Sequence, residues 1–185
     1  RPSPILLITV TIYFGLYRHR LVIAFFSLAL LYQFFHWVEH VAQVYQHWLQ
    51  ALPAKDSHGI LFFLDFEWNH FVFNTGYFVA LLIVLVMLVV RRQAFGIRAS
   101  ALWLLGIGTA VQGYHQVEHV VKISQHLARD CESCPGILGK MLDGVYLHFT
   151  LNTLVLLFPL AAFFIVVAAR LIHRRDVVAV HEVVY

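Results

Sequence analysis

Charged residues are scarce in this sequence: Asp, Glu, Lys and Arg make up 12% of its 185 residues, whereas hydrophobic residues make up 61%. Soluble globular domains carry about twice that share of charge, so the composition excludes an ordinary cytosolic enzyme. A disordered chain and a coiled coil are excluded equally. The formal net charge of +3 is small and scattered, which excludes a nucleic-acid-binding protein. What remains is a polytopic helical membrane protein of one domain.

Cysteine is also rare, with only two in the chain, so a disulfide-stapled secreted module is excluded. Cys131 and Cys134 lie between two apolar segments, in the sequence Cys-Glu-Ser-Cys-Pro. A metal could use their thiolates, but a lone pair without further cysteine or histidine partners at zinc spacing favours a local disulfide of this loop.

Apolar segments dominate the rest of the chain. We expect an all-α membrane protein with five transmembrane helices, at 4–17, 21–50, 67–90, 98–128 and 143–171. The first segment is short and is interpreted as a peripheral span within residues 1–20. The others form two helical hairpins, at 21–92 and 98–175, which pack as a four-helix bundle, and residues 176–185 are a tail.

Arginines gather at one set of helix ends, at 18–20, 91–98 and 170–175, and acidic residues gather in the loops 51–66 and 129–142. Under the positive-inside rule the arginine clusters and the C-terminus are cytoplasmic. The acidic loops then face outward, from what we take to be a bacterial plasma membrane.

The two hairpins repeat each other in sequence. Residues 33–47 (QFFHWVEHVAQVYQH) and 112–126 (QGYHQVEHVVKISQH) are identical at eight of fifteen positions, at a constant offset of 79. A second set of residues recurs at an offset of 78: Asp65, His70, Phe71, Asn74 and Thr75 match Asp143, His148, Phe149, Asn152 and Thr153. We interpret this as a duplicated hairpin whose copies are parallel and related by a pseudo-two-fold axis along the membrane normal.

Twelve histidines are unusual in such a chain, because a polar side chain in hydrocarbon needs a partner or a task. Helical periodicity places those of each repeat on one helix face, in the outer half of the bundle. Imidazole and carboxylate together suit a transition metal. The predicted metal ligands are His36, Glu39, His40, His70, His115, Glu118, His119 and His148.

Six further polar residues are expected to support these ligands or to guide a cation toward them. They are Asn74, Asn152, Asp65, Asp143, His47 and His126. The predicted cofactor is copper or iron, with zinc less favoured, and copper or iron implies redox work such as oxygen chemistry or electron transfer.

Three other interpretations of the histidines compete with a metal centre. A b-type haem needs two facing histidines on different helices, for which His36 and His115 are the candidates. A proton or ion path is disfavoured because the helices below Asn74 and Asn152 are continuously apolar. Interhelical hydrogen bonding alone explains a single buried histidine better than two symmetric ranks of them. The two H-x-x-E-H segments match the motif of inverzincin metalloproteases, but the duplication and the intramembrane setting are unlike that family.

The partners of the chain follow from its size and its surface. The lipid bilayer is the first partner, and nucleic acid is not expected. With 185 residues and short loops, the chain has little room for a substrate pocket. It either acts alone or as a homo-oligomer, or it serves as a subunit of a larger membrane oxidoreductase.

Overall fold

The structure, a computed structural model, describes residues 4–61, 67–94, 96–131 and 134–184, and within these ranges it describes the side chains of residues 19–170. It consists of four α-helices, α1 (Pro4–Trp48), α2 (Glu67–Val90), α3 (Ala99–Arg129) and α4 (Gly144–Val184). Two short 3-10 helices, η1 (Ala54–Asp56) and η3 (Leu138–Lys140), lie in the loops. The described residues contain no β-strand.

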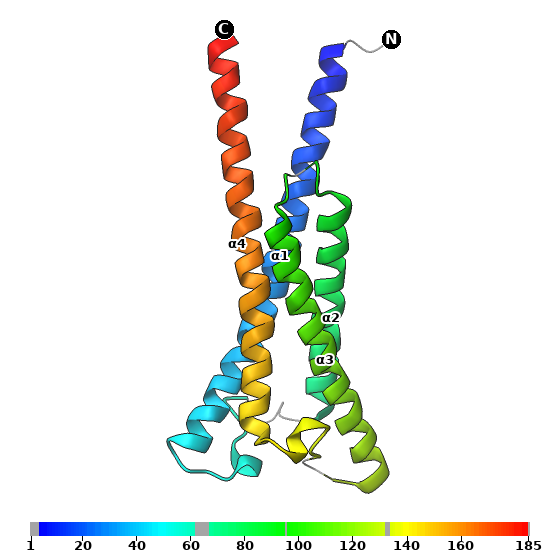
Figure 1. The fold of residues 1–185 in the computed structure, drawn as a ribbon, viewed down its shortest axis with the longest axis vertical. Helices are drawn as coiled ribbons and strands as arrows, with labels where there is room; N and C mark the ends of the chain where they lie inside the picture. Colours follow the sequence, from blue (N-terminus) through cyan, green and yellow to red (C-terminus); the bar gives the residue numbers. More distant parts are fainter. Residues whose placement is uncertain (1–3, 62–66, 95, 132–133, 185) are drawn as a thin grey trace.

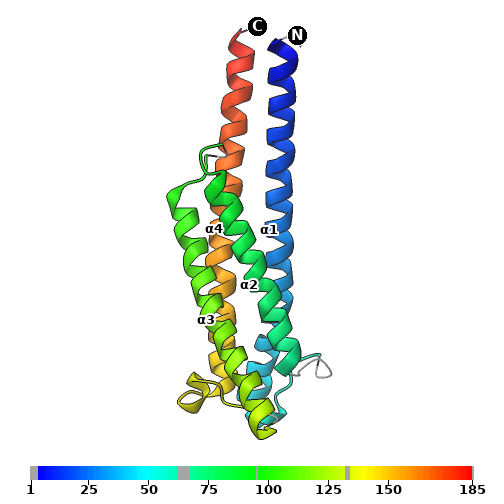
Figure 2. The same cartoon turned by 90° about the vertical axis from the view of Figure 1, so that its right-hand side faces the viewer.

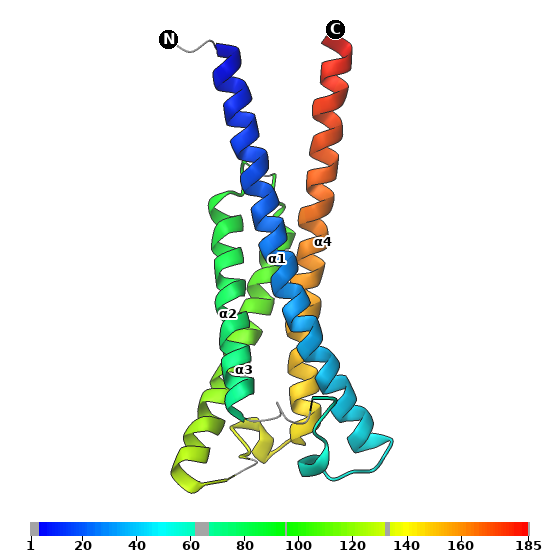
Figure 3. The ribbon, with the colours of Figure 1, turned by 180° about the vertical axis from the view of Figure 1, so that it is seen from behind.

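The helices form an antiparallel up-and-down bundle (Figures 1 and 2). Helix α1 packs against α2 and α4, and α3 packs against the same two helices, so α1 and α3 are diagonal in the bundle. The loops with η1 and η3 lie at one end, and both chain termini lie at the other, where α1 and α4 extend beyond the α2–α3 turn (Figures 1 and 3).

The prediction of a separate first helix at 4–17 is wrong, because α1 is continuous from Pro4 to Trp48. Positive charge at 18–20 suggested a helix end, but neither Gly nor Pro stands there, and arginine is a good helix former. The helix of 45 residues is about 68 Å long at about 1.5 Å per residue. The predicted tail at 176–185 likewise begins as a continuation of α4, which runs to Val184.

Three helical segments are long and apolar enough to cross a membrane: His19–Trp48, Glu67–Val90 and Gly144–Arg170. Helix α3, predicted as a span too, has 31 residues but is more polar than the other three and is not among these candidates. Large apolar side chains cover the outside of the bundle, among them Leu28, Phe35, Val72, Val86, Trp103 and Phe164, each more than half exposed. These findings are consistent with membrane insertion.

The interior of the bundle has an apolar half and a polar half. Toward the α2–α3 turn the core is apolar, with Phe26, Leu81, Leu88 and Leu105 fully buried. Toward the η1 and η3 loops many of the buried side chains are polar, among them Gln33, His36, His40, Gln43, Asn74, Gln112, His115, Glu118, His119 and Asn152. The fold therefore encloses its polar residues at one end and exposes its apolar ones, which is the arrangement that a lipid environment requires.

Candidate metal centre

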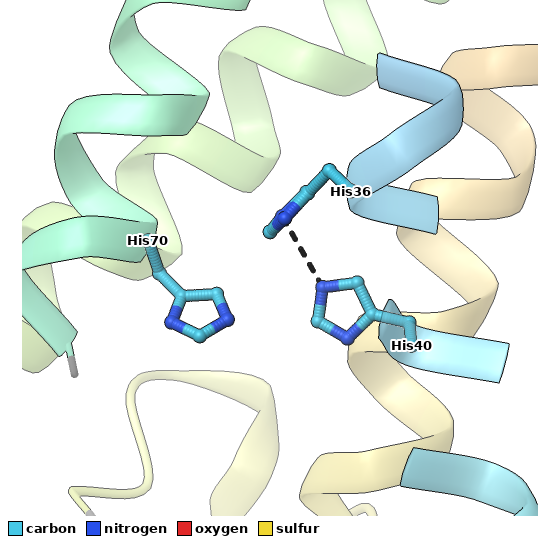
Figure 4. A group of neighbouring side chains, drawn as sticks. All are labelled: His36, His40 and His70. Carbon is cyan, nitrogen blue, oxygen red and sulfur yellow. Dashed lines mark hydrogen bonds between the residues drawn. The ribbon is translucent and has the colours of Figure 1, made fainter. Parts of the chain in front are cut away.

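Three of the predicted ligands meet between α1 and α2. His36 and His40 are one helical turn apart on α1, and their Nε2 atoms lie 3.2 Å from each other. His70 comes from α2, and its ring centroid is 5.4 Å from that of His36 and 5.7 Å from that of His40. Each of these residues offers one nitrogen such that the three nitrogens lie within 4.8 Å of one another. Figure 4 shows the three rings converging on a common space. We call them the first triad.

The matching residues of the second repeat meet between α3 and α4. The Nε2 atoms of His115 and His119 are also 3.2 Å apart, and His115 Nε2 lies 3.3 Å from His148 Nδ1. This second triad meets the same criterion, with one nitrogen from each residue within 4.8 Å of the others. His115 and His119 are almost completely buried. Each member of the second triad is 79 or 78 positions after its counterpart in the first.

The two triads are in contact. The rings of His40 and His148 stack with their centroids 5.9 Å apart, and those of His70 and His119 do the same at 5.9 Å. Six imidazoles from all four helices thus form one continuous cluster. Two ions, one in each triad, would be close neighbours.

The spacing within each triad is that of ligands on a shared ion. Metal–imidazole bonds of about 2.0–2.1 Å at tetrahedral angles separate two ligand nitrogens by about 3.3 Å. The Nε2 pairs of both triads, at 3.2 Å, match that separation. Three imidazoles also leave a fourth position of a tetrahedral ion open for water or a substrate.

Oxygen acceptors orient one histidine in each triad. His40 Nδ1 donates to Gln43 Oε1 at 2.7 Å, and His119 Nδ1 donates to Glu67 Oε1 at 2.9 Å. A proton on Nδ1 leaves Nε2 with the lone pair that a metal requires. Metal-binding histidines usually have such an acceptor behind them, because it fixes the tautomer and makes the ligand more basic.

Asn74 and Asn152 lie one helical turn beyond His70 and His148, and Asn74 Nδ2 lies 3.1 Å from His119 Nε2. The Nδ2 of each donates to the carbonyl oxygen of the histidine four residues earlier on its own helix, at 2.9 Å. Gln112 donates to Asn74 Oδ1 at 3.0 Å, and Gln33 donates to Asn152 Oδ1 at 2.8 Å. These bonds cross from one hairpin to the other and close the polar half against the apolar core.

The structure does not bring Glu39 and Glu118 into the triads. Glu39 Oε2 accepts hydrogen bonds from the backbone N–H groups of the loop after α1, at Ile60 (2.8 Å) and Leu61 (3.2 Å). Glu118 accepts from Ile137 N at 2.7 Å and Leu138 N at 2.9 Å in the loop after α3. Each carboxylate therefore holds the following loop to its own helix.

The remaining support residues also act on the loops. His47 Nδ1 donates to the Leu52 carbonyl and its Nε2 lies 3.3 Å from Asp143 Oδ2, while His126 Nδ1 donates to the Cys131 carbonyl. Asp143 Oδ1 also accepts from two backbone N–H groups in the first turn of α4. Cys131 and Cys134 form the expected disulfide. Asp65 lies outside the described residues.

Sequence reasoning missed two charged residues at the centre. Glu67 Oε2 pairs with Lys122 Nζ at 2.9 Å, and the same ammonium donates to His148 Nε2 at 3.2 Å. Glu67 stands three residues before His70, and Lys122 three residues after His119, so helical spacing alone places each on the face of a ligand. Both break the repeat, because their counterparts are Val145 and Gln43.

The chain matches no protein-family model, no curated protein and no solved structure.

Both triads open toward the loop end of the bundle. A cavity of about 700 Å³ there is lined by His40 and His70 from the first triad and by His119 and His148 from the second, with Glu67 and Lys122 beside them. Its walls combine polar and apolar side chains of the two loops and helix ends. A hydrated cation therefore has a route from the loop end to four of the six imidazoles without crossing the apolar core.

Proposed function

We propose that this chain is a membrane protein whose two equivalent hairpins hold a pair of transition-metal ions, one in each histidine triad. The observation that carries the proposal is that each triad presents three imidazole nitrogens within 4.8 Å and has an oxygen acceptor behind one histidine. Hydrogen bonding between helices explains the asparagines and glutamines. It does not require two sets of three converging imidazoles.

Matched contacts support the equivalence of the hairpins. Glu39 and Glu118 each anchor the following loop by two backbone N–H groups. Gln46 exchanges two hydrogen bonds with the backbone of Gly59, and Gln125 exchanges two with Gly136. The helix partners of these contacts are 79 positions apart and the loop partners 77. Such recurring contacts are expected when one hairpin has been duplicated.

The donor set favours copper. Imidazole suits zinc, copper and iron, whereas the di-iron sites of helix bundles rely on several carboxylates. Here two of the predicted carboxylate ligands hold loops, and among the described residues the acid at the centre is Glu67, which is bound to His119 and Lys122. A copper pair implies redox work, either oxygen chemistry or electron transfer, by this chain alone or as a subunit of a larger membrane oxidoreductase.

Haem gains no support from the geometry. His36 and His115 each have an Nε2 atom at 3.2 Å from the next histidine of the same helix. An axial haem ligand instead directs its free nitrogen at an iron in the plane of a macrocycle. Nothing in the described part of the chain favours this arrangement over the triads.

The test is the metal content of the protein, purified in a mild detergent without added metal and analysed by mass spectrometry. We expect the wild type to contain two copper ions per chain. We expect His40→Ala and His119→Ala to contain one copper ion each. His47→Ala and His126→Ala are matched controls, since these histidines bind loop carbonyls outside the triads and should keep both ions. Circular dichroism checks that every variant remains helical.

Two results would overturn the proposal. One is a helical protein with no stoichiometric transition metal. The other is metal that both triad variants retain in full. Iron or zinc in the same stoichiometry would keep the two-ion centre and refute copper.

A further inference from the structure

A second cavity lies beside the first triad, between α1 and α2. Its volume is about 350 Å³, within the usual range of small-molecule sites. Its polar wall is formed by His36, His70, Glu39, Gln43 and Asn69. Two metal-ligand candidates thus stand at the inner side of a space large enough for an organic molecule.

The rest of this lateral cavity is apolar and belongs to the outside of the bundle. Four of its lining residues are large hydrophobic side chains that are partly open to the surroundings: Phe35 is 62% exposed, Val72 63%, Leu61 42% and Tyr32 41%. Tyr32, Phe35 and Val72 lie on the flank of two helices that are apolar enough to cross a membrane, and Leu61 lies in the loop after α1. In a bilayer such side chains face lipid, so the cavity faces lipid as well.

The corresponding flank of the second hairpin is built differently. Helices α3 and α4 pack more extensively than α1 and α2 do. Tyr114, at the position equivalent to Phe35, donates from its hydroxyl to Glu118 Oε1 at 2.6 Å. The phenylalanine of the first hairpin lacks this hydroxyl. The two triads therefore differ in their access from the side.

We infer that the lateral cavity admits an amphiphile from the bilayer, a molecule with a long apolar body and a nitrogen or oxygen head group, whose head binds the metal of the first triad. This inference rests on the proposed function. The apolar mouth selects the body of the ligand, and a metal held by His36 and His70 would lie at the inner wall, where the head group could reach it. The second triad holds its ion without contact to such a ligand.

The experiment uses the full chain loaded with Co²⁺ and placed in phosphatidylcholine nanodiscs, with 1-dodecylimidazole as the probe. The absorption bands of Co²⁺ report a change in its ligands, and the dodecyl chain keeps the probe in the bilayer. We expect a spectral change for the wild type and for His115→Ala plus His119→Ala, which retains only the first triad. We expect none for His36→Ala plus His40→Ala.

A second set of variants tests the route of the probe. Val72→Trp narrows the mouth of the lateral cavity and should weaken the probe about tenfold, by removing space that the ligand needs. Thr150→Trp is the matched control, because Thr150 is the exposed equivalent of Val72 on α4 and should leave the titration unchanged. Leu61→Trp, on the loop side of the mouth, provides an independent obstruction with the same expected effect.

The outcomes separate this inference from the proposed function. If the purified protein holds no transition metal and Co²⁺ also fails to bind, the proposed function is refuted and the lateral site with it. If Co²⁺ binds in both triads but the probe changes no spectrum, or acts equally on Val72→Trp, Leu61→Trp and Thr150→Trp, only the lateral site is refuted. Water-soluble imidazole competing as well as the dodecyl probe would also refute it, since access would then run through the loop end.

Discussion

The two glutamates of the repeated motif provide a sharp test of the centre. The sequence pattern makes Glu118 a metal ligand, whereas the structure uses it to hold the loop after α3. Glu118→Gln keeps the size and one oxygen acceptor of the side chain but removes its charge. A metal ligand should not tolerate this change, whereas a loop anchor should tolerate it in part.

The magnitude follows from the three hydrogen bonds of Glu118. Its carboxylate accepts from Tyr114 at 2.6 Å, from Ile137 N at 2.7 Å and from Leu138 N at 2.9 Å, and the residue is 1% exposed. Hydrogen bonds to a charged group contribute about 1.5–3 kcal/mol each, and neutral ones about 1 kcal/mol. Glutamine can keep two of the three bonds as neutral ones, so we expect Glu118→Gln to lower the free energy of unfolding by about 2.5 kcal/mol, and Glu118→Ala, which removes all three, by about 4.5 kcal/mol.

The assay pairs metal analysis with thermal unfolding in the same detergent. Glu118→Gln should unfold at a lower temperature than the wild type and keep its full metal content, and Glu39→Gln should do the same in the other hairpin. His119→Ala should lose one ion. If Glu118→Gln loses an ion while its unfolding temperature is unchanged, the carboxylate is a ligand and the assignment of Glu118 to the loop is refuted.

Three other predictions concern the metal centre and the apolar core beside it. Lys122→Gln, which introduces the residue found at the equivalent position 43, should raise the affinity of the second triad for its ion about tenfold. The ammonium beside His148 repels a metal ion, and removing about 1.4 kcal/mol of repulsion gives that factor. Weaker binding in a competition titration would contradict this. Metal affinity should fall as the solution is acidified, since protons compete for the imidazole lone pairs; an affinity that stays constant in chelator titrations down to pH 4 would contradict this. Tyr77→Phe should cost about 1 kcal/mol of stability, because the hydroxyl bond to the Val155 carbonyl at 2.9 Å is lost, and unchanged metal content would separate this effect from the centre.

The periodicity of an α-helix and the sequence repeat together were sufficient to identify the histidine candidates. Spacing of three and four residues put His36 and His40 on one face, and the offset of the repeat selected the same pair in α3, so their convergence was predictable. The helix break that we expected before Leu21 does not occur. A cluster of arginines can indicate a membrane boundary, but it does not end a helix.

The carboxylates show where pattern reasoning stopped. Helical periodicity predicts the direction in which a side chain points, but not which group it will bind. The loop N–H groups that bind Glu39 come from residues more than twenty positions away. Glu67 was overlooked for the opposite reason. Its counterpart in the other hairpin is Val145, so a search for residues shared by both repeats discards an acid that contacts a triad histidine.

The crossed hydrogen bonds from Gln33 to Asn152 and from Gln112 to Asn74 have a consequence for the chain as a whole. Each hairpin supplies the glutamine that donates a hydrogen bond to the asparagine of the other hairpin. Neither hairpin alone therefore completes the hydrogen bonds beneath its own triad. A chain severed in the turn at 91–98 would behave as a two-subunit assembly with a nearly self-complementary interface. Metal uptake by the separated halves would then depend on their concentration, and a single hairpin at high dilution would remain empty.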